Sequence, residues 1–285
     1  MKSPLFGLGI LGIIVVNALT CSAATITFEA AASNPASLTP TVDAFRSAIG
    51  GGTVSGANGD FGGLRREINW DGVPNASADP NLLAANFFNT TSPRGAVFST
   101  PGTGFLVSAN AGQATPTLFG FANDFQTFSP QKLFTAVGSN IVDVSFFLPG
   151  TTTMATTNSF GVVFVDVEVA GATQLQFFDE GNNLIFSRDA LVAGNQGLSF
   201  LGGIVDAGGP QIGRVRITAG SNTIISNGVL GNQIGDVVVM DDFIYGTPTT
   251  TTRNVPDSGS VSVLLGGALL ALAALKRRCA MERSS

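Results

Sequence analysis

The chain has 285 residues, a formal net charge of −5 and no histidine. The lack of histidine excludes Ser-His-Asp and Cys-His catalysis, zinc sites built on histidine, and a histidine general base. Between residues 25 and 254 the chain carries 9 basic and 17 acidic side chains, a balance that disfavours nucleic acid as a partner and leaves cations and neutral sugars open.

The first 24 residues have the three parts of a signal peptide. Lys2 provides the positive start, residues 5–19 are apolar, and small residues follow at 21–24. Signal peptidase removes peptides of this kind, so we expect export and a mature region that begins directly afterwards. A lipoprotein modified at Cys21 is the alternative, although the three residues before this cysteine are a poor lead-in to it.

Residues 25–246 are expected to form one mostly β domain without disulfides, because both cysteines lie outside this region. Short alternating segments recur about every ten residues, with turn residues between them, and this spacing favours a sandwich or a barrel. The expected strands are 25–29, 141–148, 160–169, 173–178, 184–188, 198–205, 212–218, 223–226 and 236–245. A short helix is expected at 41–49, capped by Thr39 or Thr41, and a glycine-rich loop at 50–63.

The last 31 residues combine a turn, an apolar segment and a basic cluster, and they follow a Thr- and Pro-rich linker at 247–254. The turn consists of Val255, Pro256, Asp257, Ser258 and Gly259, and the basic cluster of Lys276, Arg277 and Arg278. As a helix, the apolar segment at 261–275 would be about 22 Å long, which is short of a hydrocarbon core of about 30 Å. We expect a transmembrane helix there, with the basic cluster on the cytoplasmic side.

This order resembles the C-terminal sorting signal of the PEP-CTERM class, in its VPDSG variant, over residues 255–279. The resemblance implies that an exosortase-type membrane transpeptidase recognises the turn and processes the tail. The protein would be exported, held in the membrane before processing, and placed at the cell surface or in the extracellular matrix afterwards. A plain membrane anchor that is never processed is the alternative.

Parts of the expected β domain resemble a domain of unassigned function that is common in secreted bacterial proteins of the same sorting class. The segments that carry this second resemblance are 65–74, 85–105, 160–169, 213–220 and 236–246. It implies a jelly-roll-like β-sandwich similar to carbohydrate-binding modules, and it brings no activity with it. We therefore expect a non-enzymatic protein, with exopolysaccharide as a candidate partner.

Asp166 and Glu168 are two residues apart on the strand expected at 160–169, so both side chains should leave the same face, about 7 Å apart. Such a pair suits the acid and the nucleophile or base of a glycan hydrolase, which is the rival function. The plainer alternative is a solvated strand end that pairs across the sheet with Arg214 and Arg216, and a metal site is a third.

Asp241 and Asp242 lie near the end of the last expected strand, where neighbouring side chains point to opposite faces unless the strand bends. A carboxylate that faces the core needs a partner. Jelly-roll modules of the kind the resemblance implies often hold a structural calcium between their first and last strands, and Glu29 in the first strand is the matching residue. Asp43 or backbone carbonyls could add ligands, and the alternative is a hydrogen bond to a neighbouring loop.

Trp70 is the only tryptophan, and Asn69, Asp71 and two arginines lie close to it in the sequence. If exposed, it would form a sugar-binding platform, because its ring offers a face for stacking and its neighbours offer polar groups for hydroxyls. We therefore consider Trp70 and Asp71 as glycan contacts. The alternative is an anchor in the core or in a loop.

Overall fold

The computed structural model describes residues 25–51, 64–232 and 234–250. The expected signal peptide, most of the glycine-rich loop, the sorting motif and the expected membrane helix lie outside these ranges. Within them, no helix is both long enough and apolar enough to span a membrane. The expected linker is described only as far as residue 250, and its Thr249 exchanges two backbone hydrogen bonds of 2.9 Å with Thr156.

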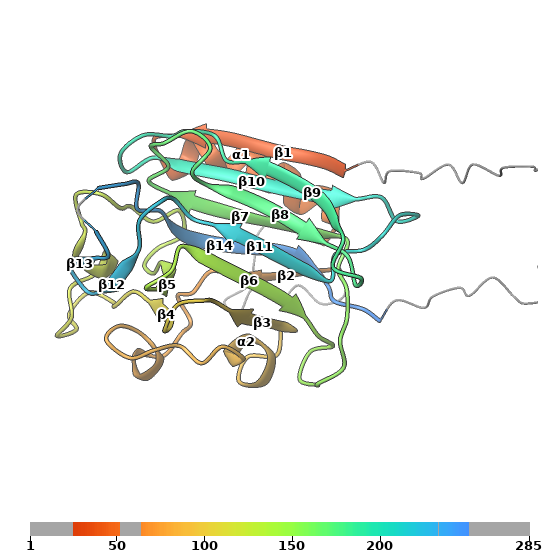
Figure 1. Cartoon of the computed structure of the whole chain (residues 1–285), viewed down its shortest axis with the longest axis horizontal. Helices are drawn as coiled ribbons and strands as arrows, with labels where there is room; N and C mark the ends of the chain where they lie inside the picture. The colour runs from red at the N-terminus through yellow and green to blue at the C-terminus, as the bar shows by residue number, and fades with distance from the viewer. Residues whose placement is uncertain (1–24, 52–63, 233, 251–285) are drawn as a thin grey trace, which may run out of the picture. The chain divides into compact units, whose positions relative to one another are not determined.

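The domain is mostly β and contains two sheets (Figure 1). The larger sheet has nine strands, and its main path runs β1 (Thr25–Ala32), β10 (Leu198–Val205), β7 (Ser159–Val165), β14 (Val239–Gly246), β5 (Phe134–Val137), β12 (Ile224–Ser226) and β13 (Val229–Leu230). Two strands lie off this path, β2 (Arg65–Ile68) beside β14 and β4 (Gly104–Val107) beside β5. The β5–β12 pair is parallel, and the other pairs in this sheet are antiparallel.

The smaller sheet has five strands and is antiparallel throughout. Its order is β3 (Ala96–Ser99), β6 (Ile141–Phe146), β11 (Arg214–Thr218), β8 (Gln174–Phe178) and β9 (Leu184–Asp189). The hairpin expected around residues 179–183 is confirmed, since β8 and β9 pair with each other and Asn182 in the turn has a φ of 62°. The other expected strands are also present, although most of their ends shift by one to four residues.

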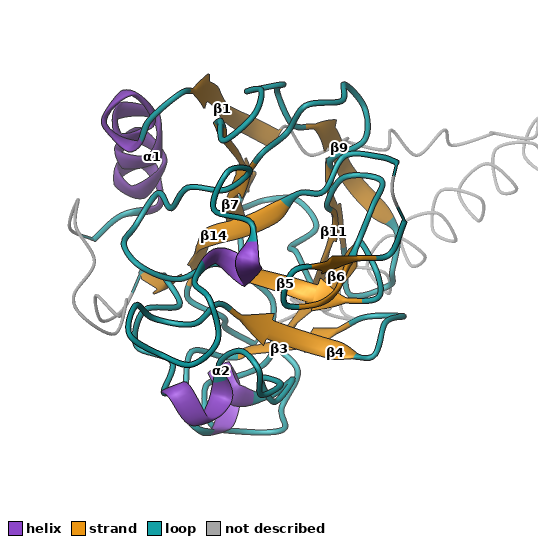
Figure 2. Cartoon of the chain, turned by 90° about the vertical axis from the view of Figure 1, so that its left-hand side faces the viewer, coloured by secondary structure: helices purple, strands orange, loops and turns teal. Residues whose placement is uncertain are grey.

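A large apolar core lies between the two sheets, and a second one lies on the far face of the larger sheet. Strand β7 contributes to both, because alternate residues face opposite sides. Its Phe160, Val162 and Phe164 pack in the core between the sheets, whereas Val163 and Val165 pack in the second core with the residues of α1 (Pro35–Ile49). Figure 2 shows the resulting order of layers, with α1, the larger sheet and the smaller sheet following one another.

Helix α1 begins six residues before the helix predicted at 41–49. Its N-cap is Asn34, whose side chain accepts a hydrogen bond of 3.0 Å from the backbone N–H of Ser37, and Pro35 occupies the first helical position. Pro40 lies inside the helix. The predicted caps, Thr39 or Thr41, were therefore wrong. Pro40 lacks an N–H donor and costs the helix one hydrogen bond, and the burial of Leu38, Val42 and Phe45 compensates for that loss.

Two glycines allow α1 to lie close to the larger sheet. Gly161 of β7 and Gly202 of β10 are register partners, and the ring of Phe45 from α1 fills the space above them. A Cβ added to Gly161 or Gly202 would lie 2.7 Å or 2.9 Å from that ring. Side chains at these positions would push the helix away from the sheet.

The remaining helical elements of the described residues are short and lie in the connections. They are α2 (Phe87–Thr90) and two 3-10 turns, Asn75–Ser77 and Leu118–Gly120.

Candidate functional site

Asp166 and Glu168 do not lie on a strand as predicted. Strand β7 ends at Val165, and Asp166 has a φ of 73°, a left-handed conformation that breaks the alternation of side chains. Asp166 is buried, with 3% of its surface exposed, whereas Glu168 is exposed. The two side chains therefore do not leave a common strand face.

The predicted pairing of these two carboxylates with Arg214 and Arg216 is also wrong. Both arginines lie on β11 of the smaller sheet, beside β6, and they bind Asp143 of that strand. Arg214 Nη1 is 2.6 Å from Asp143 Oδ1, and Arg216 Nη2 is 2.7 Å from Oδ2. The arginines and Asp166 belong to different sheets, which the alternation along a single strand does not reveal.

Asp166 and Glu168 instead form a cluster with Asp236. One carboxylate oxygen from each residue lies within 4.8 Å of the other two. Strands β7 and β14 are antiparallel neighbours in which Val165 pairs with Val239, so the end of one strand meets the approach to the other. Asp236 Oδ2 also accepts hydrogen bonds from the backbone N–H groups of Glu168 (3.2 Å) and its successor Val169 (3.1 Å).

The charges around this acidic cluster are negative. Burial and, to a smaller extent, the carboxylates of Glu168, Asp236 and Asp124 raise the pKa of Asp166 to about 7. The 2.8 Å hydrogen bond from the Gln196 N–H acts in the opposite direction. Burial also raises the pKa of Asp236. None of the ion pairs among the described residues involves the three carboxylates of the cluster. Chemically, the cluster is a set of hard oxygen ligands without a cation from the protein.

The predicted calcium ligands Glu29, Asp241 and Asp242 are not brought together. In the larger sheet β10 and β7 lie between β1 and β14, so the first and last strands are not neighbours. Glu29 binds Arg188 instead, with Oε2 2.6 Å from the arginine Nε, and this hydrogen bond lowers the pKa of Glu29. A calcium ion shared by these three residues is therefore ruled out by the order of the strands.

Asp241 and Asp242 are themselves close together, because β14 bends, which is the exception that the prediction of opposite faces allowed. The register of β14 against β7 shifts between Met240 and Phe243, which indicates a bulge. Ser129 Oγ lies 3.0 Å from Asp241 Oδ1 and 2.7 Å from Asp242 Oδ1. Burial and the neighbouring carboxylate raise the pKa of Asp241 well above its ordinary value, and burial raises that of Asp242 to about 6.

The partner of Asp242 is a buried ion-pair network that joins α1 to the larger sheet. Arg46 of α1 places Nη2 2.9 Å from Glu67 Oε2 and 3.1 Å from Asp242 Oδ2. Arg65 places Nε 2.7 Å from Glu67 Oε1 and donates from Nη1 to the carbonyls of Arg46 and Gly50, at the end of the helix. The carbonyl of Arg46 also accepts the capping N–H of Gly50 at 3.1 Å, so the guanidinium adds a positively charged donor at the negative end of the helix dipole. The network fixes the helix in place.

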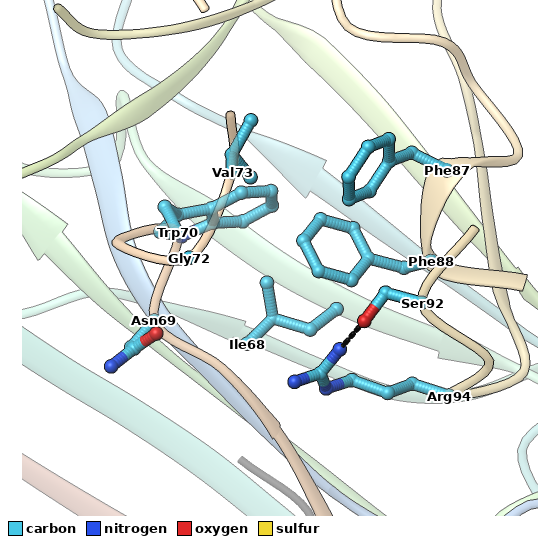
Figure 3. A pocket seen from close by; sticks show the side chains of 9 residues that line it. All are labelled: Ile68, Asn69, Trp70, Gly72, Val73, Phe87, Phe88, Ser92 and Arg94. Atoms are coloured by element: carbon cyan, nitrogen blue, oxygen red, sulfur yellow. Dashed lines mark hydrogen bonds between the residues drawn. The ribbon is translucent and has the colours of Figure 1, made fainter. Parts of the chain in front are cut away.

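Trp70 is buried, with 1% of its surface exposed, so the predicted sugar platform at Trp70 and Asp71 is wrong. Its ring stacks on Phe134 with a centroid distance of 4.0 Å, and its indole N–H donates to the carbonyl of Asp241 in the bulge at 2.8 Å. The pocket beside it has a volume of about 20 Å³, enough for about one water molecule (Figure 3). Asp71 accepts backbone hydrogen bonds from Gln131 and Lys132, so it holds a loop.

An open depression of about 520 Å³ lies between α2, β3 and the loop after β6. Its lining consists of Asn86, Asn89, Thr90, Val97, Phe147, Gly150, Thr151 and Thr152. No charged residue is among them, and the half-buried ring of Phe147 lies among amide and hydroxyl groups. The prediction missed this site because its residues come from separate segments. An aromatic ring beside polar groups was also the combination expected around Trp70, where the polar neighbours include Asp71 and two arginines.

The tail is the part of the chain that comparison with known proteins identifies. Residues 254–279 match the family model of the VPDSG-CTERM motif. No curated protein and no solved structure matches the chain. The motif implies export, targeting to the cell surface and processing by a sorting transpeptidase. The chain thus carries a PEP-CTERM-like sorting tail of the VPDSG type.

Proposed function

We propose that this protein is placed at the cell surface or in the extracellular matrix through its tail, and that its domain, a jelly-roll-like β-sandwich, binds polysaccharide there without turning it over. The match of residues 254–279 to the VPDSG-CTERM motif carries the proposal. In this scheme signal peptidase removes residues 1–24, and the helix at 261–275 holds the chain in the membrane. An exosortase-type transpeptidase then acts near Val255 to Gly259.

Two features of the domain support binding in place of catalysis. The depression around Phe147 offers an aromatic ring and neutral polar groups, which suits a neutral sugar. Asp166, the residue expected to act as acid or nucleophile, is buried, and its Oδ1 already accepts the N–H of Gln196. A hydrolase that uses Asp166 and Glu168 is the alternative function, and it requires that the buried carboxyl reach a glycosidic bond.

Replacing Pro256 and Asp257 by alanine should leave a full-length, membrane-held protein. The double substitution removes the residues that form the turn, so the transpeptidase loses the segment that it is proposed to recognise. Intact mass of the protein from each fraction of the native host measures the result. We expect a parent C-terminus within or near residues 255–259 and an intact C-terminus in the variant. Equal masses and locations for the two would make the tail a plain anchor.

Replacing Phe147 by alanine should weaken retention on polysaccharide from the native host by about 2- to 10-fold, because stacking on an aromatic ring contributes on the order of 0.5–1.5 kcal/mol. The control is Leu184→Ala, which removes a side chain that is 54% exposed on β9, away from the depression. Retention on immobilised glycan and release of reducing ends are measured together. Equal loss in both variants would contradict binding at Phe147. Release of reducing ends that disappears in Asp166→Asn would establish the hydrolase instead.

A further inference from the structure

Asp166, Glu168 and Asp236 form an acidic cluster that is separate from the calcium ligands predicted on the first and last strands. The three residues come from the end of β7 and the approach to β14. The antiparallel pairing of Val165 with Val239 brings these two segments together at one end of two central strands of the larger sheet. The cluster is therefore held by the sheet itself.

The buried oxygen of Asp236 is a second observation that indicates a ligand. Asp236 has only 4% of its surface exposed. Its Oδ2 accepts two backbone N–H groups, but its buried Oδ1 has no hydrogen-bond partner among the described residues. A buried carboxylate oxygen that has lost water and gained no donor is costly. A bound cation would remove this cost.

Two other buried carboxylates of the domain show how an arginine can neutralise such a group. Glu67 and Asp242 both face the guanidinium of Arg46, and Glu67 also faces Arg65. In the acidic cluster the nearby charges that act on Asp166 are all carboxylates. Arginines thus neutralise Glu67 and Asp242, whereas none of the ion pairs among the described residues neutralises the acidic cluster.

We propose that the carboxylates of Asp166, Glu168 and Asp236 bind one divalent cation of the calcium class. Ca²⁺ binds oxygen ligands at 2.3–2.6 Å, so two oxygens that share the ion lie no more than about 5 Å apart, and the observed spacing within 4.8 Å meets this condition. The chain has no histidine, and neither cysteine lies in the described residues, so softer metals lack their preferred ligands here. The ion would join the segment before β14 to the segment after β7 and stabilise this end of the two strands.

The test is calcium binding by the full-length chain, purified in a mild detergent and freed of metal with a chelator. Calorimetric titration with CaCl₂ should give a dissociation constant of about 0.1–1 mM, the range of extracellular calcium modules. Addition of 10 mM CaCl₂ should raise the melting temperature by several degrees, because a ligand that binds only the folded state stabilises it. MgCl₂ at the same concentration should have a smaller effect, since Mg²⁺ requires a tighter octahedral site.

Two variants and one control assign the binding to the cluster. Glu168→Gln changes an exposed side chain, and Asp236→Asn keeps an oxygen that can accept the two backbone N–H groups, so both should fold. Each should weaken calcium binding at least 10-fold, whereas Asp206→Asn, a change of an exposed carboxylate in another loop, should leave it unchanged. Absence of binding at 10 mM calcium would overturn the proposal. So would binding that survives both Glu168→Gln and Asp236→Asn.

Discussion

Replacing Glu67 by glutamine should lower the free energy of unfolding by about 3–5 kcal/mol, the usual cost of removing one partner from a buried ion pair. Glu67 is 1% exposed and accepts from both Arg46 and Arg65. Without the carboxylate, two buried guanidinium groups face a neutral amide, and the contact between α1 and the larger sheet weakens. At roughly 2–4 °C per kcal/mol for a domain of this size, the melting temperature should fall by about 10 °C.

The matched control lies in the same network. Asp43 also contacts Arg46, at 3.1 Å, but 35% of its side chain is exposed. Water therefore screens this pair, and Asp43→Asn should cost less than about 1 kcal/mol. Thermal unfolding followed by circular dichroism compares the two variants. If both lose the same stability, Glu67 is not a desolvated partner and the network does not hold the helix.

Replacing Trp70 by alanine should cost about 3–5 kcal/mol through the lost packing of a large buried side chain. Trp70 is the largest fully buried side chain of the described residues. It stacks on Phe134 with an interplanar angle of 1° and meets Phe88 and Phe243 edge to face. The substitution also leaves the carbonyl of Asp241 without its indole donor.

A second variant separates packing from the hydrogen bond. Trp70→Phe keeps an aromatic ring in the stack but has no N–H group, so it should cost about 1–3 kcal/mol, clearly less than Trp70→Ala. Urea unfolding followed by circular dichroism measures both, because neither variant retains tryptophan fluorescence. A loss below about 1 kcal/mol for the alanine variant would show that Trp70 does not anchor the core.

The alternation of residues predicted most of the strands in the second half of the domain. In β6 the alternating residues Val142, Val144 and Phe146 are all fully buried, and β10 has the predicted bounds. The prediction failed where the backbone departs from regular geometry. The left-handed turn at Asp166 and the bulge beside Asp241 each break the period of two on which the orientation of side chains was predicted.

The candidate sites depended on which strands are neighbours in the sheet, and the pattern of a single strand does not give this. Glu29 and Asp242 were paired on the assumption that the first and last strands are neighbours, and the order of the sheet separates them. Asp236 was not predicted as a site residue. It follows Gly235, which has a φ of 114°, just before the last strand. Only the pairing of β7 with β14 places it beside Asp166.

By itself the sequence determined what is local or compositional: the sorting tail, the absence of histidine chemistry and the positions of most strands. A sorting motif is a continuous segment, and alternation is a property of one strand, so neither depends on the fold. The tertiary structure decided which strands are neighbours, and therefore which acidic residues face arginines and which face one another. The order of the strands is set by the burial of apolar side chains on both faces of the larger sheet. This burial stabilises contacts between segments that are far apart in the sequence, so it cannot be read from any single segment.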